Sequence, residues 1–175
     1  MSRILDKYII HFKGLKVGKH LFEFEVNDLF FEQFPEGEIK HGLLRVNVEL
    51  DRHTNMLELS FFIEGDVELV CDRCLEPLMV PLEFEGRIIV KFGEIAEGDN
   101  DNDELWVVSE NDHEISLSHY IYESICLSFP IQRYHGIPGT SKKDCDPIML
   151  SRINHVEEKV TKTDPRWDKL NNLRN

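Results

Sequence analysis

In the stretch Gly42–Leu50, GLLRVNVEL, apolar and polar residues alternate strictly from Leu44 to Leu50. A period of two is typical of a β-strand that buries one face and exposes the other. The expected buried set is Leu44, Val46, Val48 and Leu50, and the expected exposed set is Arg45, Asn47 and Glu49. This stretch therefore predicts a half-buried strand and, with its neighbours, a sheet.

Further alternating runs lie on both sides of this strand. Short connections separate them, and short connections favour antiparallel neighbours. The segment Glu64–Asp66, EGD, reads as a tight connector in which Gly65 adopts positive φ. The sequence thus predicts an antiparallel meander, either open or closed into a barrel. The runs are Leu21–Val26, Leu57–Ile63, Val67–Cys71, Val80–Phe84 and Ile88–Phe92, and the segment 27–34 is either a helical turn or a packed loop.

The second half of the chain has helical features. The segment 115–130, ISLSHYIYESICLSFP, has apolar residues at helical spacing. Ser116 is the expected N-cap, with Ile115 and Tyr120 as a hydrophobic staple, and Pro130 ends the helix. We therefore expect one helix packed on the sheet, which makes the fold α+β.

The C-terminal part predicts an appendage to this body. The segment 134–149 is rich in glycine and proline, and we expect it to be irregular. A short helix then begins at Asp164 as the cap and Pro165 at the first helical position. Trp167, Leu170 and Leu173 would share one stripe of that helix. The expected organisation is a β-rich body over 1–132 and an appended segment over 133–175.

The charge of the chain limits its partners. Its formal net charge is −13, and the segment 94–114 holds carboxylates but neither Lys nor Arg. Such a surface repels phosphate, which argues against gripping nucleic acid by its backbone. The segment is either a solvated loop or a docking site for a basic partner.

The N-terminus and the hydropathy pattern indicate where in the cell the protein is expected. No run of about 18 apolar residues is present, and we expect no membrane span. The first twenty residues lack the features of a secretory signal. We therefore expect a cytoplasmic protein, in which cysteines are free thiols or metal ligands rather than disulfides.

The stretch Val70–Pro77, VCDRCLEP, carries two cysteines three positions apart. A redox pair would need a helix after the second cysteine to lower its thiol pKa, and here another strand follows. Two thiolates at this spacing on a turn can instead bind one tetrahedral zinc ion. Cys71 and Cys74 would then need two more ligands, and the candidates are His135, Cys145 and, less plausibly, Cys126. The alternative is a hairpin tip without metal, with Cys126 as a small core residue.

No catalytic arrangement stands out in the sequence. The eight histidines form no His-x-x-x-His pair, and GIPG at 136–139 lacks the Lys-Ser/Thr of a phosphate loop. We therefore expect a protein that is not an enzyme, with no small-molecule substrate and with zinc as the one cofactor left open.

The order of several motifs is similar to that of a known family. GDVELVCDRCLEPLMVPLEFEGRIIVKF at 65–92 precedes an acidic segment; ISLSHYIYESICLSFPIQRYH at 115–135, an Asp-Cys pair and DPRWDKLNNL at 164–173 follow. Over residues 40–173 the chain resembles the YceD family of large ribosomal RNA subunit accumulation proteins. The resemblance implies a bacterial ribosome-assembly factor that supports accumulation of large-subunit ribosomal RNA. It also implies variable metal binding, since some members carry further cysteines and others lack the first pair.

The resemblance and the acidic segment together suggest a mechanism. We expect a basic large-subunit ribosomal protein, or a pre-ribosomal particle, as the partner. The expected contact residues are Arg73 and Glu76 on the turn, and Asp99, Asp101, Asp103 and Glu104 in the acidic segment. Two alternatives remain open at this point: RNA binding through the slightly basic C-terminal end, and zinc-dependent processing of ribosomal RNA.

Overall fold

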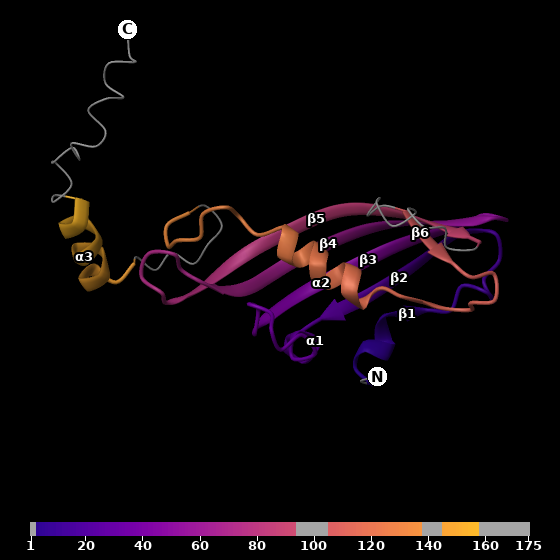
Figure 1. Cartoon of the computed structure of the whole chain (residues 1–175), viewed down its shortest axis with the longest axis horizontal. Coiled ribbons are helices and arrows are strands. Elements are labelled where there is room, and N and C mark those ends of the chain that lie inside the picture. Colours follow the sequence, from indigo (N-terminus) through magenta and orange to yellow (C-terminus); the bar gives the residue numbers. More distant parts are fainter. Residues whose placement is uncertain (1–2, 94–104, 138–144, 158–175) are drawn as a thin grey trace, which may run out of the picture. The chain divides into compact units, whose positions relative to one another are not determined.

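The computed structural model describes residues 3–93, 105–137 and 145–157 (Figure 1). The chain forms two compact units. Unit 1 comprises Met1–Leu69 and Met79–Ile131, and unit 2 comprises Val70–Leu78 and Gln132–Asn175. Within the described residues, the chain passes from unit 1 into unit 2 at the end of one long strand and returns at the start of the next.

A five-stranded sheet is the main feature of unit 1, with the order β2-β3-β4-β5-β6. Its strands are β2 (Gly18–Val26), β3 (Gly42–Arg52), β4 (Met56–Val70), β5 (Pro77–Phe92) and β6 (Leu105–Val108). β2 pairs with β3 and β3 with β4 in antiparallel fashion, whereas β6 pairs with β5 in parallel. The predicted α+β meander is confirmed, but the sheet is mixed and open rather than closed into a barrel.

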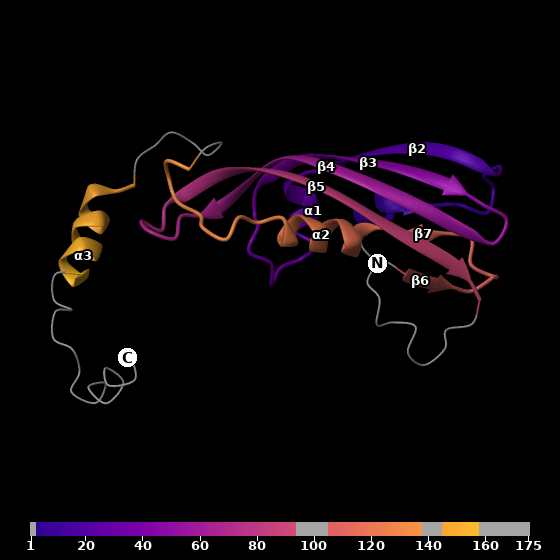
Figure 2. The ribbon, with the colours of Figure 1, turned by 90° about the horizontal axis from the view of Figure 1, so that it is seen from above.

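One face of the sheet carries the core. Leu44, Val46, Val48 and Leu50 are all fully buried, as the alternation predicted. Helix α2 (Ser118–Leu127) packs on this side, as Figure 2 shows, and buries Ile121 and Ile125 against it. The ring of Tyr120 from α2 lies 4.5 Å from the Phe61 ring and 5.8 Å from that of Trp106. Each fully buried large apolar side chain contributes about 1.5–3 kcal/mol, so this layer dominates the stability of unit 1.

The predicted connector at Glu64–Asp66 is wrong, because β4 runs through it without interruption. Gly65 faces the core side, in phase with the buried residues Ile63 and Val67. It has a φ of 151°, and a Cβ at this position would collide with the carbonyl oxygen of Leu43 on β3. Glycine is therefore required here by a close approach of two strands rather than by a turn.

Helix α2 begins later than predicted. Its N-cap is Leu117, which makes no side-chain capping bond, and not Ser116. The reason is that Ile115–Ser116 forms strand β7, which pairs with β1 (Ile9–Ile10) in antiparallel fashion. Ser116 is thus held in the β1–β7 pair, and its Oγ contacts the Ser118 Oγ at 3.1 Å. The helix ends at Leu127, before Pro130, as expected.

The acidic segment is not one uninterrupted loop. Leu105–Val108 within it forms β6, an apolar run that pairs with β5 from Ile89 to Phe92. Residues 109–114 are described and largely exposed, and Glu114 lies 3.1 Å from the ring of His11. Asp99, Asp101, Asp103 and Glu104 lie outside the described residues.

The remaining helices are short. A 3-10 helix, η1, spans Leu5–Tyr8. Helix α1 (Asp28–Phe31) confirms the helical turn and is capped by Asn27, whose Oδ1 accepts from the Leu29 N–H at 3.2 Å.

In unit 2, α3 (Pro147–Glu157) begins where an irregular segment was expected, because Asp146 caps it through a 3.0 Å bond from the Ile148 N–H. The expected helix after Asp164 lies outside the described residues. None of the described helices is long and apolar enough to span a membrane.

Candidate metal centre

A tight turn between β4 and β5 positions the first two cysteines. The Cys71 N–H donates to the Glu76 carbonyl at 2.9 Å, and the Leu75 N–H donates to the Cys71 carbonyl at 2.9 Å. Leu75 takes a φ of 62°, the left-handed region that residues with a Cβ adopt at a cost of about 1–3 kcal/mol. The turn therefore brings Cys71 and Cys74 onto the same side, where both side chains are buried.

A second segment is fastened to this turn by a reciprocal contact. The Asp72 N–H donates to the Arg133 carbonyl at 2.6 Å, and the Arg133 N–H donates to Asp72 Oδ2 at 2.8 Å. The Arg133 guanidinium also lies 3.4 Å from Asp72 Oδ1. These contacts fix the backbone two residues before His135. Asp72 thus has a structural role.

The His135 side chain faces the cysteines, and only 6% of the residue is exposed. Its Nε2 lies 3.2 Å from the Pro77 carbonyl oxygen. Because a carbonyl oxygen only accepts hydrogen bonds, this contact requires the proton on Nε2. In the neutral ring the lone pair of Nδ1 is then available to a metal, and a hydrogen bond from the other ring nitrogen to a carbonyl is what orients histidine ligands in metal sites.

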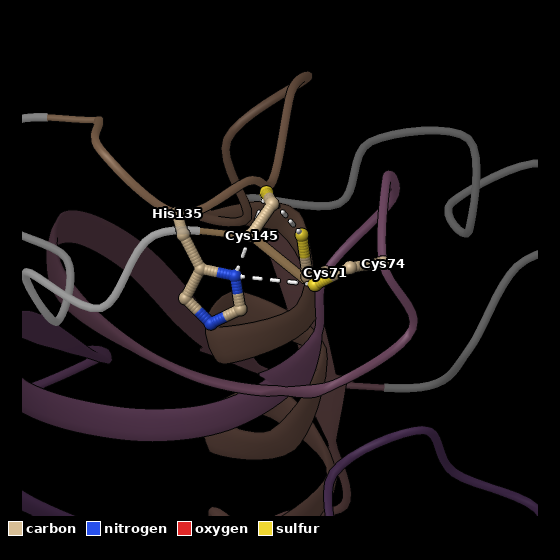
Figure 3. Close-up of side chains that lie close together, drawn as sticks. All are labelled: Cys71, Cys74, His135 and Cys145. Atoms are coloured by element: carbon tan, nitrogen blue, oxygen red, sulfur yellow. Dashed lines mark hydrogen bonds between the residues drawn. The ribbon is translucent and has the colours of Figure 1, made fainter. Parts of the chain in front are cut away.

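The four predicted ligands meet at one point, as Figure 3 shows. We call this group the Cys/His cluster: Cys71, Cys74, His135 and Cys145. Its ligand atoms all lie within 4.8 Å of one another, and all four residues are buried. All four belong to unit 2.

Three of the distances within the Cys/His cluster are close to those of a tetrahedral site. The Sγ atoms of Cys71 and Cys145 are 3.7 Å apart, and His135 Nδ1 lies 3.4 Å from Cys74 Sγ and 3.7 Å from Cys145 Sγ. Zn–S bonds of about 2.3 Å and a Zn–N bond of about 2.0 Å place tetrahedral ligand atoms roughly 3.5–3.8 Å apart. A disulfide would need sulfurs about 2.0 Å apart, so the three cysteines are free thiols.

The environment favours a thiolate at one of the cysteines. Burial opposes the charged form of Cys71, but the backbone N–H groups of Cys74, Arg73 and His135 outweigh it and lower the thiol pKa from 9.0 to about 6. Burial raises the pKa of the Cys145 thiol, as does its contact with Cys71. A cation among the sulfurs is what would stabilise all three thiolates together.

The other candidate residues lie apart from the cluster. Cys126 lies on α2 in unit 1, where burial raises its thiol pKa, and it is not one of the four. Arg73 and Glu76 are exposed on the turn. The Arg73 guanidinium lies 3.7 Å from the centre of the Tyr134 ring, a cation–π contact that further joins the two segments. Their role as partner contacts stays a prediction.

The chain is thus an α+β protein with a buried Cys₃His group, to which a hairpin turn and a later segment each contribute residues. A family model, YceD, described as large ribosomal RNA subunit accumulation protein YceD, matches residues 59–174. The chain belongs to this family, as its motifs indicated. The search of curated proteins and that of solved structures gave no significant match.

Proposed function

We propose that this chain is a non-catalytic assembly factor of the large ribosomal subunit, and that it acts in the cytoplasm by binding a basic ribosomal protein or a pre-ribosomal particle. The observation that carries the proposal is the family match over residues 59–174. The family is named for accumulation of the large ribosomal RNA subunit, which supports a role in making or maintaining that subunit.

The charge of the chain supports a protein partner rather than direct contact with RNA. A net charge of −13 repels the phosphate backbone and attracts basic proteins, and ribosomal proteins are the commonest of these. Most of the C-terminal basic residues that could oppose this lie outside the described residues. The described residues therefore favour binding to protein.

We propose that the Cys/His cluster holds a structural zinc ion. Cys71, Cys74, Cys145 and His135 would supply all four ligands of a tetrahedral site. A closed site of this kind leaves no position for a water or substrate, whereas catalytic zinc keeps one open. Zinc would thus join the turn to the later segment without doing chemistry, which supports a non-catalytic role.

The direct test is a strain that lacks the gene. We expect the ratio of large-subunit to small-subunit ribosomal RNA to fall, and to recover when the full chain is expressed from a plasmid. The tagged chain should also sediment with large-subunit precursors at low salt and be released at high salt, because exposed charges are screened. An unchanged RNA ratio together with no association with precursor particles would contradict the proposal.

A further inference from the structure

The side of the sheet opposite α2 is not covered by any described element of unit 1 (Figure 2). Alternate residues of β2, β3, β4 and β5 point to it, and none of these is buried. We call it the outer face. Its charged residues are ten acids (Glu23, Glu25, Glu49, Asp51, Glu58, Glu64, Asp66, Glu68, Glu83 and Glu85) and four bases (Lys19, Arg45, Arg87 and Lys91). The outer face is thus strongly acidic within a single unit.

Three of the four bases are already paired with acids of this face. Lys19 Nζ lies 2.6 Å from Glu49, Arg45 lies 3.7 Å from Glu64, and Arg87 lies 2.8 Å from Glu58. Within the described part of the chain, the carboxylates of Glu23, Asp66, Glu83 and Glu85 have no such partner. The excess negative charge therefore remains available to a cation from outside.

The register of the strands places one pair of like charges directly opposite each other, among pairs of opposite charge such as Arg45 and Glu64. Asp51 of β3 lies directly opposite Glu58 of β4. Like charges at opposite positions of an antiparallel pair destabilise the sheet. The fold does not require this arrangement, since neutral residues would serve as well on an exposed face. Arg87, 2.8 Å from Glu58, offsets part of this repulsion, and a cationic partner near Asp51 would relieve the rest.

Apolar side chains are exposed among these carboxylates. Leu21 on β2 is 78% exposed and Leu43 on β3 is 61% exposed. A hollow of about 930 Å³ is lined by Leu21, Phe62 and the carboxylates of Glu23, Glu49 and Glu85, together with neighbouring residues. A second hollow of about 350 Å³, lined by Leu43, Glu25 and Glu64, among others, lies farther along the same strands. Each hollow is lined by apolar residues, by carboxylates and by one arginine, Arg87 in the first and Arg45 in the second.

We propose that the outer face binds an extended, lysine- and arginine-rich polypeptide segment with interspersed apolar residues. This inference rests on the proposed function and names the surface that meets the basic protein. Lysine and arginine carry apolar stems that cover leucine and phenylalanine while their charged ends reach carboxylates. RNA is a poor occupant, because its phosphates meet the unpaired acids.

The binding test uses the full chain and a fluorescent peptide in which Lys and Arg alternate with Leu and Ala. The test variant is Glu23→Gln/Asp66→Asn/Glu85→Gln, which neutralises three unpaired carboxylates of the outer face. The matched control is Glu32→Gln/Glu36→Gln/Glu123→Gln, three exposed acids outside the outer face and the acidic segment with the same change in net charge. We expect at least about tenfold weaker binding by the test variant and at most about twofold by the control. Equal weakening of both would overturn the proposal, because it would show attraction by net charge alone.

Two further readouts locate the site. Backbone amide shifts caused by the peptide should cluster on β2 to β5, and Leu21→Asn, at an exposed position, should weaken binding separately. Shifts spread over the whole surface would contradict a defined site. A fragment of large-subunit ribosomal RNA should not displace the peptide; displacement with shifts on the same face would assign the face to RNA and overturn the proposal.

Complementation separates this inference from the proposed function. If the wild type and the control restore the large-subunit RNA ratio in the deletion strain but the test variant does not, both the proposed function and the binding role of the outer face are supported. Full restoration by the test variant would refute the outer face and leave the proposed function intact. A deletion strain with a normal RNA ratio and no association with precursors would instead refute the proposed function, and the peptide titration would then still decide whether the face binds basic segments.

Discussion

The Cys/His cluster and the outer face differ in how their polar groups are satisfied. In the cluster, all four residues are buried, and three contacts between their sulfur and nitrogen atoms measure 3.4 to 3.7 Å. On the outer face, exposed carboxylates outnumber the cations beside them, and several have no ion pair within the described residues. If the cluster binds zinc as proposed, its buried thiolates need that ion for the fold itself. Exposed carboxylates do not, and their excess is free to serve a partner.

The largest effect is expected from breaking the cluster. Cys74→Ser should abolish stoichiometric zinc and unfold the turn and the later segment locally, since a structural zinc site contributes on the order of 10 kcal/mol in small zinc domains. Metal analysis and limited proteolysis of unit 2 would measure both effects. Cys126→Ser is the control, because Cys126 is not part of the cluster. This variant should keep stoichiometric zinc. Retention of zinc by Cys74→Ser would show that the assignment of ligands is wrong.

A smaller effect is expected from the sheet that carries the outer face. Gly65→Ala should lower the free energy of unfolding by more than about 2 kcal/mol, because the residue has a φ of 151° and its Cβ would collide with the Leu43 carbonyl. Gly14→Ala is the control, since no atom lies within 4 Å of its Cβ position, and it should change stability by at most about 0.5 kcal/mol. Chemical denaturation measures both. Equal stability of the two variants would contradict the close approach of β3 and β4.

The outer-face acids should contribute little to folding. Neutralising Glu23, Asp66 and Glu85 should leave the melting temperature unchanged or raise it slightly, because it removes repulsion without removing an ion pair. A thermal melt at low salt would measure this. A clear fall in the melting temperature would mean that these carboxylates stabilise the fold, and the contrast with the cluster would disappear.

The smallest effect concerns the exposed pair of Asp28 and His41, whose ring Nδ1 lies 2.9 Å from Asp28 Oδ2. The hydrogen bond to Asp28 raises the pKa of His41, and the bonds from His41 and the Gly42 N–H lower the pKa of Asp28. The His41 contribution to stability is present below its ordinary pKa and is lost as pH rises through the raised value. The Asp28 contribution is present above its ordinary pKa and is lost as pH falls through the lowered value.

An NMR titration of the histidine rings tests this pair. Asp28→Asn should return the pKa of His41 towards its ordinary 6.5, whereas Asp66→Asn on the outer face should leave it unchanged. A His41 pKa that is the same in the wild type and in Asp28→Asn would show that the pair does not form in solution.

Periodicity predicted the sheet well, because buried and exposed residues must alternate along a strand. The alternation also indicates a continuous strand at Gly65, because the apolar residues before and after it, Ile63 and Val67, are in the same phase. A turn would usually break that phase. The strand β6 was missed although LWVV is an apolar run, because acidic neighbours concealed it and its parallel pairing with β5 depends on a long connection.

The candidate ligands could be named from residue type, but the sequence could not show that they lie close together in the fold. Cys71 and Cys145 are 74 positions apart, and no spacing rule connects them. What brings them together is a turn with Leu75 in the left-handed region and the Asp72–Arg133 contact, neither of which has a signature in one sequence. The outer face was also missed, because its carboxylates are dispersed over four strands and gather only when the strands pair.

The most direct test of the central claim is X-ray absorption at the zinc edge on the purified full chain, with its metal content measured in parallel. We expect one zinc per chain, bound by three sulfurs at about 2.3 Å and one nitrogen at about 2.0 Å. A chain that folds without metal, or a zinc shell containing oxygen in place of one of these ligands, would contradict a closed Cys₃His site.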